Sequence, residues 1–266
     1  MADIDVVKEA VELGAAGTFS FNQYSSVSFN QLCLSSNSEA GDATGLRVYS
    51  GAHVLTRFLS STQGLPLLDG KRVVELGCGT GVVGCVVAVN ANLSQLVLTD
   101  GDERSCALAQ RNAECIVHPV KGALKVTTQQ LLWGGSPLES TFDVVIGCEL
   151  MYYQTNVAAL IQTVQALAPC GLFLHAHLFR QDEHGDTMRE IFDQTGWDTA
   201  LVPVPSFIPP AEMSLWPQWL NVCCLVSGPR AQIELLLALN PSWSRFQDVD
   251  ATLDENLRVA EEMEDN

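Results

Sequence analysis

Basic side chains are scarce in this sequence of 266 residues. It holds 14 lysines and arginines against 31 aspartates and glutamates, so the formal net charge is −17. A nucleic-acid partner requires basic contacts with its phosphates, and this composition argues against one. An acidic surface keeps a protein in solution, and it also suits a basic protein surface as partner. We therefore expect no nucleic acid among the partners.

Long apolar runs are absent as well, since no stretch reaches the roughly 18–20 residues of a membrane-spanning helix. Residues 1–14 carry acids instead of the basic segment and apolar core of a signal peptide. The nine cysteines include no C-x-x-C pair, which is typical of small core residues in a reducing compartment. These features predict a protein of the cytoplasm, or also of the nucleus, without a membrane segment.

Strand and helix patterns alternate from residue 72 onward. Strands are predicted at 72–76, 96–99, 124–128, 142–147 and 172–178, and helices at 82–90, 103–114, 156–168 and 187–195. This alternation is typical of a mostly parallel sheet with helices on both faces. Two late strands, 199–204 and 220–226, are joined by a proline-rich loop without a helix. They predict an antiparallel pair at one edge of the sheet.

The two ends of the chain differ from this central region. Alternating apolar residues around 22–26 predict a β-hairpin. Residues 248–266 hold eight acids and one base, which predicts a solvated tail with a helix at 253–263. We therefore divide the chain into an N-terminal extension of helix and hairpin (1–46), an α/β domain (47–247) and an acidic C-terminal tail (248–266).

The most informative segment is residues 73–81, Val-Val-Glu-Leu-Gly-Cys-Gly-Thr-Gly. An apolar run carrying a glutamate leads into three glycines at alternate positions, and a second apolar run follows. This pattern predicts a buried strand entering a tight turn that opens a helix. Glycine lets the backbone approach a ligand closely and adopt a positive φ without strain. We expect a nucleotide-like cofactor at this turn.

Two cofactors compete for the glycine turn. Gly79, Gly81 and Gly84 form G-x-G-x-x-G with Asp100 about twenty residues on, which is the fingerprint of a dinucleotide site such as that for NAD. Alternatively, the unit begins at Glu75 and binds S-adenosylmethionine, which has no phosphate and carries an ammonium group. A carboxylate at Glu75 would repel a pyrophosphate, so Glu75 favours S-adenosylmethionine. Asp100 fits both, because both cofactors carry a ribose diol.

Five segments in a fixed order carry a resemblance to a known family. They are residues 45–55 (Gly-Leu-Arg-Val-Tyr-Ser-Gly-Ala-His-Val-Leu), 75–81, 98–100 (Leu-Thr-Asp), 132–134 (Leu-Trp-Gly) and 142–152, which ends in the acid-x-x-Tyr signature Glu-Leu-Met-Tyr. In them the sequence resembles the class I S-adenosylmethionine-dependent methyltransferases, and more narrowly the protein-lysine methyltransferases of methyltransferase family sixteen. The resemblance spans roughly residues 19–226. Two positions depart from the family: Tyr49 stands where it has Trp, and Glu149 where it has Asp.

The resemblance implies a Rossmann-like, doubly wound and mostly parallel sheet of seven strands, with one antiparallel edge strand and an N-terminal β-hairpin extension. It implies S-adenosylmethionine as cofactor, bound by Tyr49, Glu75, Gly77, Cys78, Gly79, Gly81, Asp100, Trp133 and Cys148. Asp100 would accept the ribose hydroxyls, Trp133 and Cys148 would line the adenine pocket, and Tyr49 would close over the methionine end. The alternatives are a helix cap for Asp100 and ordinary packing for the other three.

The catalytic residues implied by the resemblance are Glu149 and Tyr152. A lysine with a pKa of about 10.4 is mostly charged at neutral pH, and methyl transfer requires it neutral and aligned. Glu149 would hold the acceptor nitrogen and Tyr152 would shape its channel; the alternative is a capping glutamate and a packing tyrosine. His175 and His177 share one face of a strand without a third ligand nearby, so we expect no metal.

We therefore expect a methyltransferase that acts on a lysine ε-amine of a protein, and a monomer. Relatives that methylate chaperones and translation factors imply such a partner by resemblance. The alternatives are a small-molecule or non-lysine protein methyltransferase, an NAD-dependent dehydrogenase, and a catalytically silent scaffold on the same fold.

Overall fold

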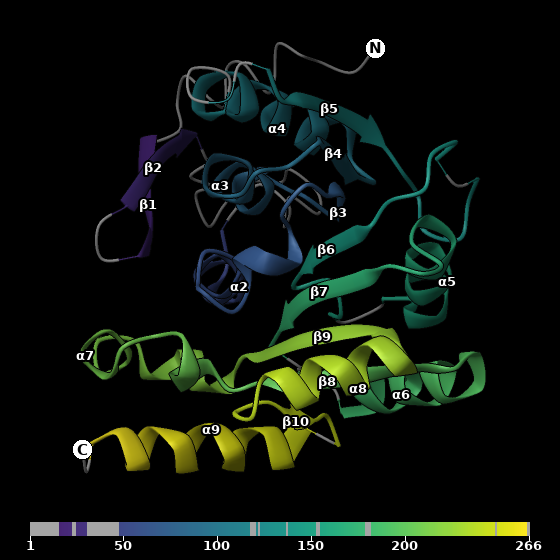
Figure 1. Ribbon diagram of the computed structural model, residues 1–266. Coiled ribbons are helices and arrows are strands. Elements are labelled where there is room, and N and C mark those ends of the chain that lie inside the picture. Colours follow the sequence, from purple (N-terminus) through teal and green to yellow (C-terminus); the bar gives the residue numbers. More distant parts are fainter. Residues whose placement is uncertain are drawn as a thin grey trace, which may run out of the picture.

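The computed structural model of the protein describes residues 16–22, 25–30, 48–117, 121, 123–136, 138–152, 155–178, 182–247 and 249–264. Within them, eight strands form one sheet in the order β10-β8-β9-β7-β6-β3-β4-β5 (Figure 1). The strands are β3 (Arg72–Leu76), β4 (Gln95–Asp100), β5 (Lys125–Gln130), β6 (Val144–Cys148), β7 (Leu172–His177), β8 (Trp197–Val202), β9 (Cys223–Pro229) and β10 (Ser244–Arg245). The helices are α2 (Ser50–Leu59), α3 (Val82–Asn90), α4 (Glu103–Ile116), α5 (Val157–Leu167), α6 (Asp182–Thr195), α7 (Pro210–Met213), α8 (Arg230–Leu239) and α9 (Val249–Glu264), with short 3-10 turns η2 (Leu65–Leu67), η3 (Val204–Ser206) and η4 (Pro217–Asn221).

The predicted fold class is confirmed. Strands β5, β4, β3, β6 and β7 run parallel to one another, and the pairings of β7 with β9, β9 with β8 and β8 with β10 are antiparallel. The chain moves outward from β3 to β4 and β5 and then returns to place β6 on the other side of β3. The carboxyl ends of β3 and β6 therefore meet where the direction of winding reverses, which is where open α/β sheets bind ligands.

The antiparallel part of the sheet differs in detail from the sequence prediction. Strands β8 and β9 pair antiparallel as expected, but β9 inserts between β7 and β8, so it does not form the edge. The connection from β8 to β9 contains η3, α7 and η4. The sheet has eight strands, one more than predicted, because the two-residue β10 pairs with β8 and is too short to show a periodic pattern.

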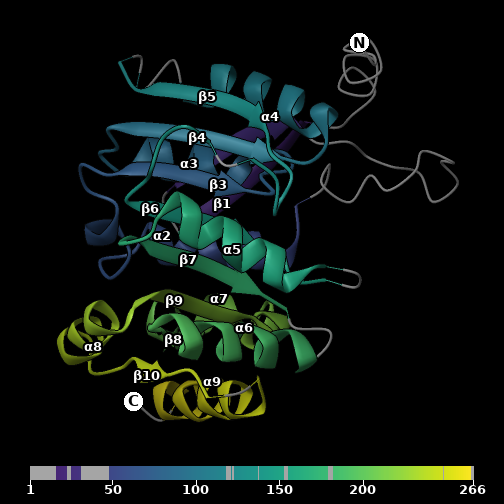
Figure 2. The same cartoon turned by 90° about the vertical axis from the view of Figure 1, so that its right-hand side faces the viewer.

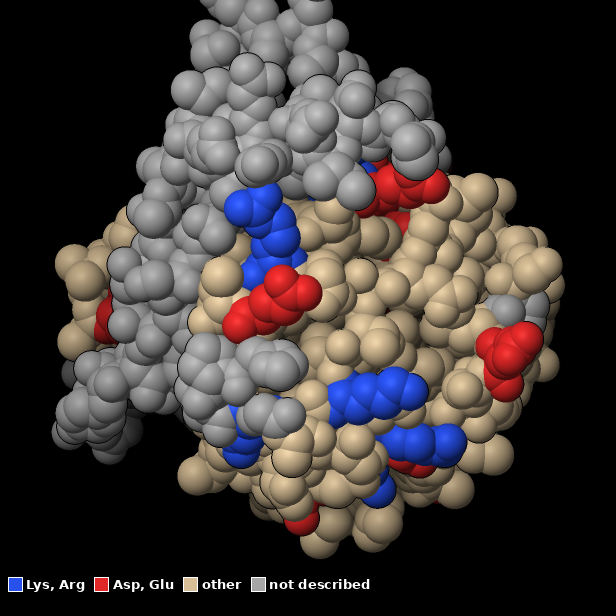
Figure 3. Space-filling model, turned by 90° about the horizontal axis from the view of Figure 1, so that it is seen from above, with Lys and Arg blue, Asp and Glu red and all other residues tan. Residues whose placement is uncertain are grey.

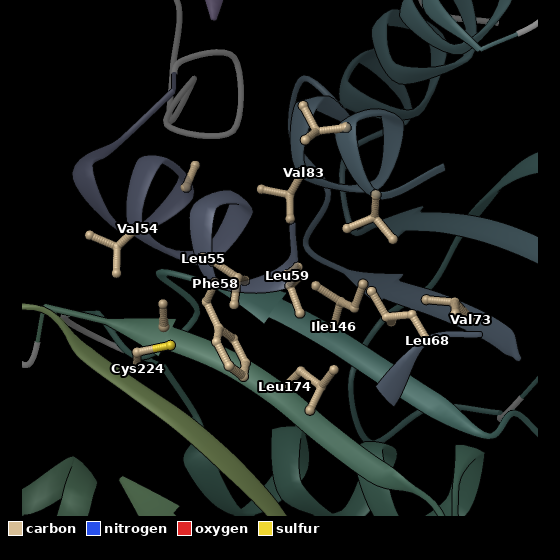
Figure 4. Close-up of a cluster of buried hydrophobic side chains, with 14 of the residues drawn as sticks. Val54, Leu55, Phe58, Leu59, Leu68, Val73, Val83, Ile146, Leu174 and Cys224 are labelled. Atoms are coloured by element: carbon tan, nitrogen blue, oxygen red, sulfur yellow. The ribbon is translucent and has the colours of Figure 1, made fainter. Parts of the chain in front are cut away.

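Alternate residues of each strand supply two hydrophobic clusters on opposite faces of the sheet. Val73 belongs to one cluster with residues of α2, α3 and α4, and Val74 belongs to the other with residues of α5 and α6. Figure 2 shows α5 and α6 lying in front of the sheet. Figure 4 shows Phe58 and Leu59 of α2 directed at the first face of the sheet. Helices therefore cover both faces, as predicted.

The acidic C-terminal segment is not the solvated tail that its composition predicted. Helix α9 begins at Val249, and Thr252 and Asn256 on it are buried. The amide of Asn256 accepts a hydrogen bond from the backbone N–H of Val204 at 3.0 Å and donates one to the carbonyl of Leu220 at 2.8 Å. The buried amide of Asn256 therefore docks this helix through backbone groups of two other segments, and a count of apolar residues does not detect such a contact.

At the other end of the chain, β1 (Ala16–Asn22) and β2 (Ser25–Asn30) pair antiparallel, with Phe19 opposite Val27 in the register. The helix expected within residues 1–14 lies outside the described residues. The division of the chain at residues 46 and 247 stays a prediction. In the part of the chain that the structure describes, no helix is long and apolar enough to cross a membrane.

Candidate active site

A cavity of about 550 Å³ opens at the carboxyl ends of β3, β4 and β6. Its walls come from the turn after β3, the end of β4, the loops after β5 and β6, and the first turns of α2, α4 and α5. Ten of the residues predicted from sequence line it: Tyr49, Glu75, Gly77, Cys78, Gly79, Asp100, Trp133, Cys148, Glu149 and Tyr152. Residues that are distant in sequence are therefore brought to one cavity, although their individual roles stay predictions.

The glycine turn has the backbone conformation that its sequence predicts. Gly77, Gly79 and Gly81 all lie in the left-handed region, with φ of 57°, 53° and 72°. A Cβ on Gly77 would lie 2.5 Å from Cδ2 of Leu150, and one on Gly81 would lie 2.8 Å from Cβ of Ala109. Gly81 precedes α3 and packs against α4 without lining the cavity, whereas Gly77 and Gly79 form part of its wall.

Glu75 reaches the beginning of α3 from the strand that precedes the turn. Its side chain is buried, and Oε2 accepts a hydrogen bond from the backbone N–H of Gly84 at 2.8 Å. Burial raises the pKa of Glu75 to about 8, with the bond from Gly84 opposing the shift and the nearby Asp100 adding to it. Glu75 therefore satisfies a backbone donor in the first turn of α3 in addition to lining the cavity.

The raised pKa of Glu75 makes stability depend on pH. The folded pKa is about 8 and the ordinary value is 4.5, so the fold binds this proton more tightly than the unfolded chain does. The stability it contributes is complete below about pH 4.5 and is lost as the pH rises towards 8. In Glu75→Gln the side chain stays neutral and can still accept from Gly84. We expect urea denaturation between pH 5 and pH 8 to show a flatter loss of stability in this variant, and an unchanged slope would contradict the assignment.

Asp100 connects the end of β4 to the glycine turn. Its Oδ2 accepts from the backbone N–H of Gly79 at 2.9 Å, and its Oδ1 accepts from that of Asp102 at 2.9 Å. Burial raises the pKa of Asp100, and these backbone bonds oppose the shift. The N-cap of α4 is Asp102, because its side chain accepts from the backbone N–H of Arg104. Asp102, and not Asp100, is therefore the capping residue of α4.

Glu149 lines the cavity just after β6, the strand on the other side of β3 from β4. Among the described residues it is the only non-glycine with a positive φ, at 54°, a conformation that is uncommon for a side chain of this kind and marks a functional or strained position. Its Oε1 accepts from the backbone N–H of Gly51 at 3.0 Å and its Oε2 from that of Leu178 at 3.2 Å. The carboxyl group thus joins the beginning of α2 to the end of β7.

The turn after Glu149 is closed by Thr155, which sequence reasoning did not single out. The Thr155 hydroxyl donates to the carbonyl of Leu150 at 2.9 Å and accepts from the backbone N–H of Tyr152 at 3.1 Å. The backbone N–H of Thr155 donates to the carbonyl of Tyr152 at 2.9 Å. Tyr152 is 42% exposed and lines the cavity wall. The bonds from Thr155 hold the backbone of Tyr152 and so fix the position from which its ring projects.

Removal of the Thr155 hydroxyl is expected to loosen this turn. Thr155→Val keeps the shape of the side chain but breaks two hydrogen bonds, each worth roughly 0.5–1.5 kcal/mol. We expect the free energy of unfolding to fall by about 1–3 kcal/mol, measured by urea denaturation. Thr155→Ser keeps the hydroxyl and serves as the control. Equal stability of the valine and serine variants would contradict this role for the hydroxyl.

Trp133 and Tyr49 approach the cavity from different loops. Trp133 is half-buried, packs against the second hydrophobic cluster, and has Cζ2 3.6 Å from where a Cβ on Gly77 would stand. Tyr49 occupies the N-cap position of α2 and lines the cavity. Cys148 is half-buried at the end of β6, and burial raises the pKa of its thiol well above the usual range. Both predicted aromatics are therefore wall residues, and Trp133 has a packing role as well.

Several wall residues were not predicted. They include Val48, Ala52, Thr80, Val82, Val83, Gly101, Asp102, Ser105, Leu131, Leu132, Leu150, Asn156 and Ala159. One signal was available for Asn156, since an asparagine before an apolar helix is a typical N-cap, and its side chain accepts from the backbone N–H of Ala159. The other residues are adjacent to predicted ones or contribute small apolar surface, for which the sequence offers no separate signal.

His175 and His177 take part in a hydrogen-bonded network inside the sheet. Nε2 of His177 lies 2.9 Å from Nδ1 of His175, and Nε2 of His175 lies 2.8 Å from the hydroxyl of Ser227. Burial lowers the pKa of His177 to about 3 and that of His175 well below its usual value. Both rings are therefore neutral, and these bonds between side chains give them a structural role.

This winding of the sheet, with a glycine turn after one strand and an acid at the end of the next, defines an α/β domain of the kind that binds a nucleotide-like cofactor. The chain belongs to the lysine methyltransferase family, whose model matches residues 28–191. That match covers the glycine turn, Asp100, Trp133 and the segment from Glu149 to Tyr152.

Curated relatives carry names that agree with this family. The chain is 31% identical over 137 residues to protein-lysine N-methyltransferase EFM3 of Chaetomium thermophilum, covering 48% of this chain and 40% of the relative. It is 28% identical to calmodulin-lysine N-methyltransferase of Arabidopsis thaliana, covering 47% and 41%. It is 34% identical to protein N-lysine methyltransferase METTL21A of Danio rerio, covering 46% and 54%. The chain thus spans about half the length of the curated relatives it matches.

A solved structure is similar in fold. It is a chain in the complex between the Haloferax volcanii Trm112 methyltransferase activator and the putative methyltransferase. The TM-score is 0.50 at 17% identity, covering 72% of this chain and 94% of that chain. At this identity the similarity supports the fold alone.

Proposed function

We propose that the protein transfers a methyl group from S-adenosylmethionine to the ε-amine of a lysine in a protein substrate. One observation carries this proposal beyond family membership. Four carboxyl groups line the cavity, those of Glu75, Asp100, Asp102 and Glu149, and no lysine or arginine is among the described residues of its wall. Carboxylates in such a wall repel a pyrophosphate and attract cations, and both the sulfonium cofactor and a lysine substrate are cations. Glu75, whose pKa burial raises to about 8, gains its charge when a cation binds beside it.

The residues present fit this cofactor. The backbone of Gly77 and Gly79 would lie against it, because neither residue has a side chain to block a close approach. Asp100 would accept the ribose hydroxyls from a position that two backbone bonds hold fixed. Trp133 and Cys148 would line the adenine pocket and Tyr49 would close over the methionine end. We place the ammonium group on the side of Glu75, whose raised pKa would fall when a cation binds beside it.

When bound, the cofactor supplies an electrophilic methyl group on a positively charged sulfur. The protein must present a lysine amine that is neutral and in line with that methyl group. We assign Glu149 to attracting and holding the acceptor nitrogen, since both of its oxygens are fixed by backbone donors before a substrate arrives. We assign Tyr152 to the wall of the acceptor channel, where its exposed ring can contact the aliphatic part of a lysine.

The direct test is to incubate the purified protein with tritiated S-adenosylmethionine and a cell extract. We expect a labelled protein band whose label survives dialysis and is released as methyllysine on acid hydrolysis. Label that passes through the dialysis membrane would support a small-molecule acceptor instead. Calorimetry with the two cofactors is the companion measurement. Tight binding of NAD without binding of S-adenosylmethionine would overturn the proposal.

The net charge of −17 supports a basic surface on the protein substrate and the absence of a nucleic-acid partner. On the face in Figure 3, lysines and arginines stand in small separate groups next to acidic side chains. By resemblance, chaperones and translation factors are the first candidates for the substrate. The described cysteines are all free thiols, which supports a reducing compartment, the cytoplasm or the nucleus. We propose a monomer, which gel filtration tests.

A further inference from the structure

The position of the Glu149 carboxylate depends on a residue that has no side chain. Gly51 is the second residue of α2, and its backbone N–H donates to Oε1 of Glu149 at 3.0 Å across 98 residues of sequence. A Cβ built on Gly51 would lie 2.6 Å from Oε1, and 3.0 Å from Cδ and Cγ, of Glu149. Any other residue at position 51 would therefore push the carboxylate away from the place it occupies.

The backbone of Gly51 gives no other reason for a glycine. It lies within α2 in helical conformation, where alanine is more favourable than glycine because glycine loses more conformational freedom on folding. A glycine in the first turn of a buried helix therefore costs helix stability. The close approach of Glu149 is the feature of the structure that accounts for it.

Two further hydrogen bonds and the backbone conformation of Glu149 restrict how far its carboxylate can move aside. Its other oxygen accepts from the backbone N–H of Leu178. The backbone N–H of Glu149 itself donates to the carbonyl of Ala176 at 2.9 Å. The φ of Glu149 is 54°, so its backbone is already in an uncommon conformation. A displacement of the carboxylate away from Gly51 would strain the bond from Leu178, while the backbone of Glu149 is held in place by Ala176.

We propose that Gly51 is a positioning residue for the reaction: the missing Cβ lets the Glu149 carboxylate dock on the first turn of α2, and this contact fixes where the acceptor nitrogen is held. The inference rests on the proposed function, in which Glu149 holds the lysine amine. Gly51 does not line the cavity. It would influence the reaction only through its contact with Glu149.

The first measurement compares two substitutions in the same turn of α2. Gly51→Ala is expected to lower kcat by about 10-fold to 100-fold, the range for a displacement of roughly 1 Å at a reacting group. The dissociation constant for S-adenosylmethionine should stay within threefold of wild type, and Tm should be unchanged or higher because alanine favours the helix. Ser50→Ala, the matched control, adds no atom at residue 51 and should leave kcat unchanged. Wild-type kcat in Gly51→Ala would overturn the inference.

The second measurement removes the group with which the new Cβ collides. Glu149→Asp shortens the side chain by one methylene, so its carboxylate no longer reaches residue 51 and kcat should fall. In that background, adding Gly51→Ala should change kcat less than threefold, since the overlap is gone. This is a non-additive pair, as expected of residues in direct contact. The same fold-loss from Gly51→Ala in both backgrounds would show that the alanine acts elsewhere, and the inference would fail.

A readout that needs no substrate separates this inference from the proposed function. Hydrogen exchange of the residue 51 amide should be slow in the wild type and faster in Glu149→Asp, because the acceptor is withdrawn. If the wild type labels no protein but shows this difference, the proposed function fails and the contact is upheld. If the wild type is active and the amide exchanges equally in both proteins, the positioning role fails while the function stands.

Discussion

Gly77→Ala is expected to weaken binding of S-adenosylmethionine by at least about 100-fold. The residue has a φ of 57°, which costs roughly 1–2 kcal/mol for a residue with a Cβ. That Cβ would stand 2.5 Å from Cδ2 of Leu150, at the part of the cavity wall where we place the cofactor. The turn would have to shift, and a shift of the glycine backbone removes the surface on which the ligand lies. Calorimetric titration with the cofactor measures the effect.

The matched control for this substitution is Gly70→Ala. Gly70 also has a positive φ, of 70°, but a Cβ built on it meets nothing within 4 Å. Gly70→Ala therefore introduces a similar backbone strain, but its Cβ meets no neighbouring side chain and residue 70 does not line the cavity. We expect a similar loss of stability in urea denaturation and no loss of cofactor affinity. Equal affinity of the Gly77 variant and the wild type would show that the turn does not lie against the cofactor.

Glu149→Gln is expected to lower kcat/KM for the protein substrate by about 100-fold or more, with the affinity for the cofactor within threefold of wild type. The amide keeps the shape of the side chain but removes the charge that attracts a lysine ammonium. Interactions with a charged partner are worth roughly 1.5–3 kcal/mol, and the amide can satisfy only one of the backbone donors of Gly51 and Leu178. Initial rates of methyl transfer give the effect, and equilibrium binding of the cofactor gives the comparison.

Two variants make this result specific. Tyr152→Phe removes a hydroxyl at the cavity wall and is expected to lower turnover more than cofactor binding. Glu114→Gln removes an acid on the exposed face of α4, bonded to Gln110, and should leave both measurements unchanged. If Glu149→Gln turned over at the wild-type rate, the assignment of Glu149 to the acceptor nitrogen would be wrong, while the cofactor assignments would be unaffected.

Features that depend on short stretches of chain were predictable. The glycine turn was predicted from three glycines at alternate positions after an apolar run, and the left-handed φ values of all three agree. The alternation of strands and helices follows from equally local patterns. The strand count was wrong by one, because two residues of β10 carry no periodicity. The solvated tail was wrong as well, because Asn256 docks α9 through hydrogen bonds to backbone groups.

The functional residues divide in the same way. From the sequence alone, Glu75, the glycines, Asp100 and Glu149 all fall at strand ends, so their meeting at one edge of a parallel sheet was predictable. Which backbone groups each carboxyl then binds was not. Gly81 packs against Ala109 on α4 and does not line the cavity, because the neighbouring helix determines which glycine of the turn faces it, and its role toward the cofactor stays a prediction.

The sequence by itself determined the fold class and the glycine turn, because these depend on local backbone geometry and on the period of apolar residues, and the family resemblance of its motifs supplied ten of the residues that line the cavity. The tertiary structure alone decided that Glu75 is bonded to α3, that its pKa is raised by burial, and that Glu149 meets Gly51. These depend on which elements become neighbours in space, and residues 98 positions apart share no local pattern. The charge and conformation of the site follow from those long-range contacts.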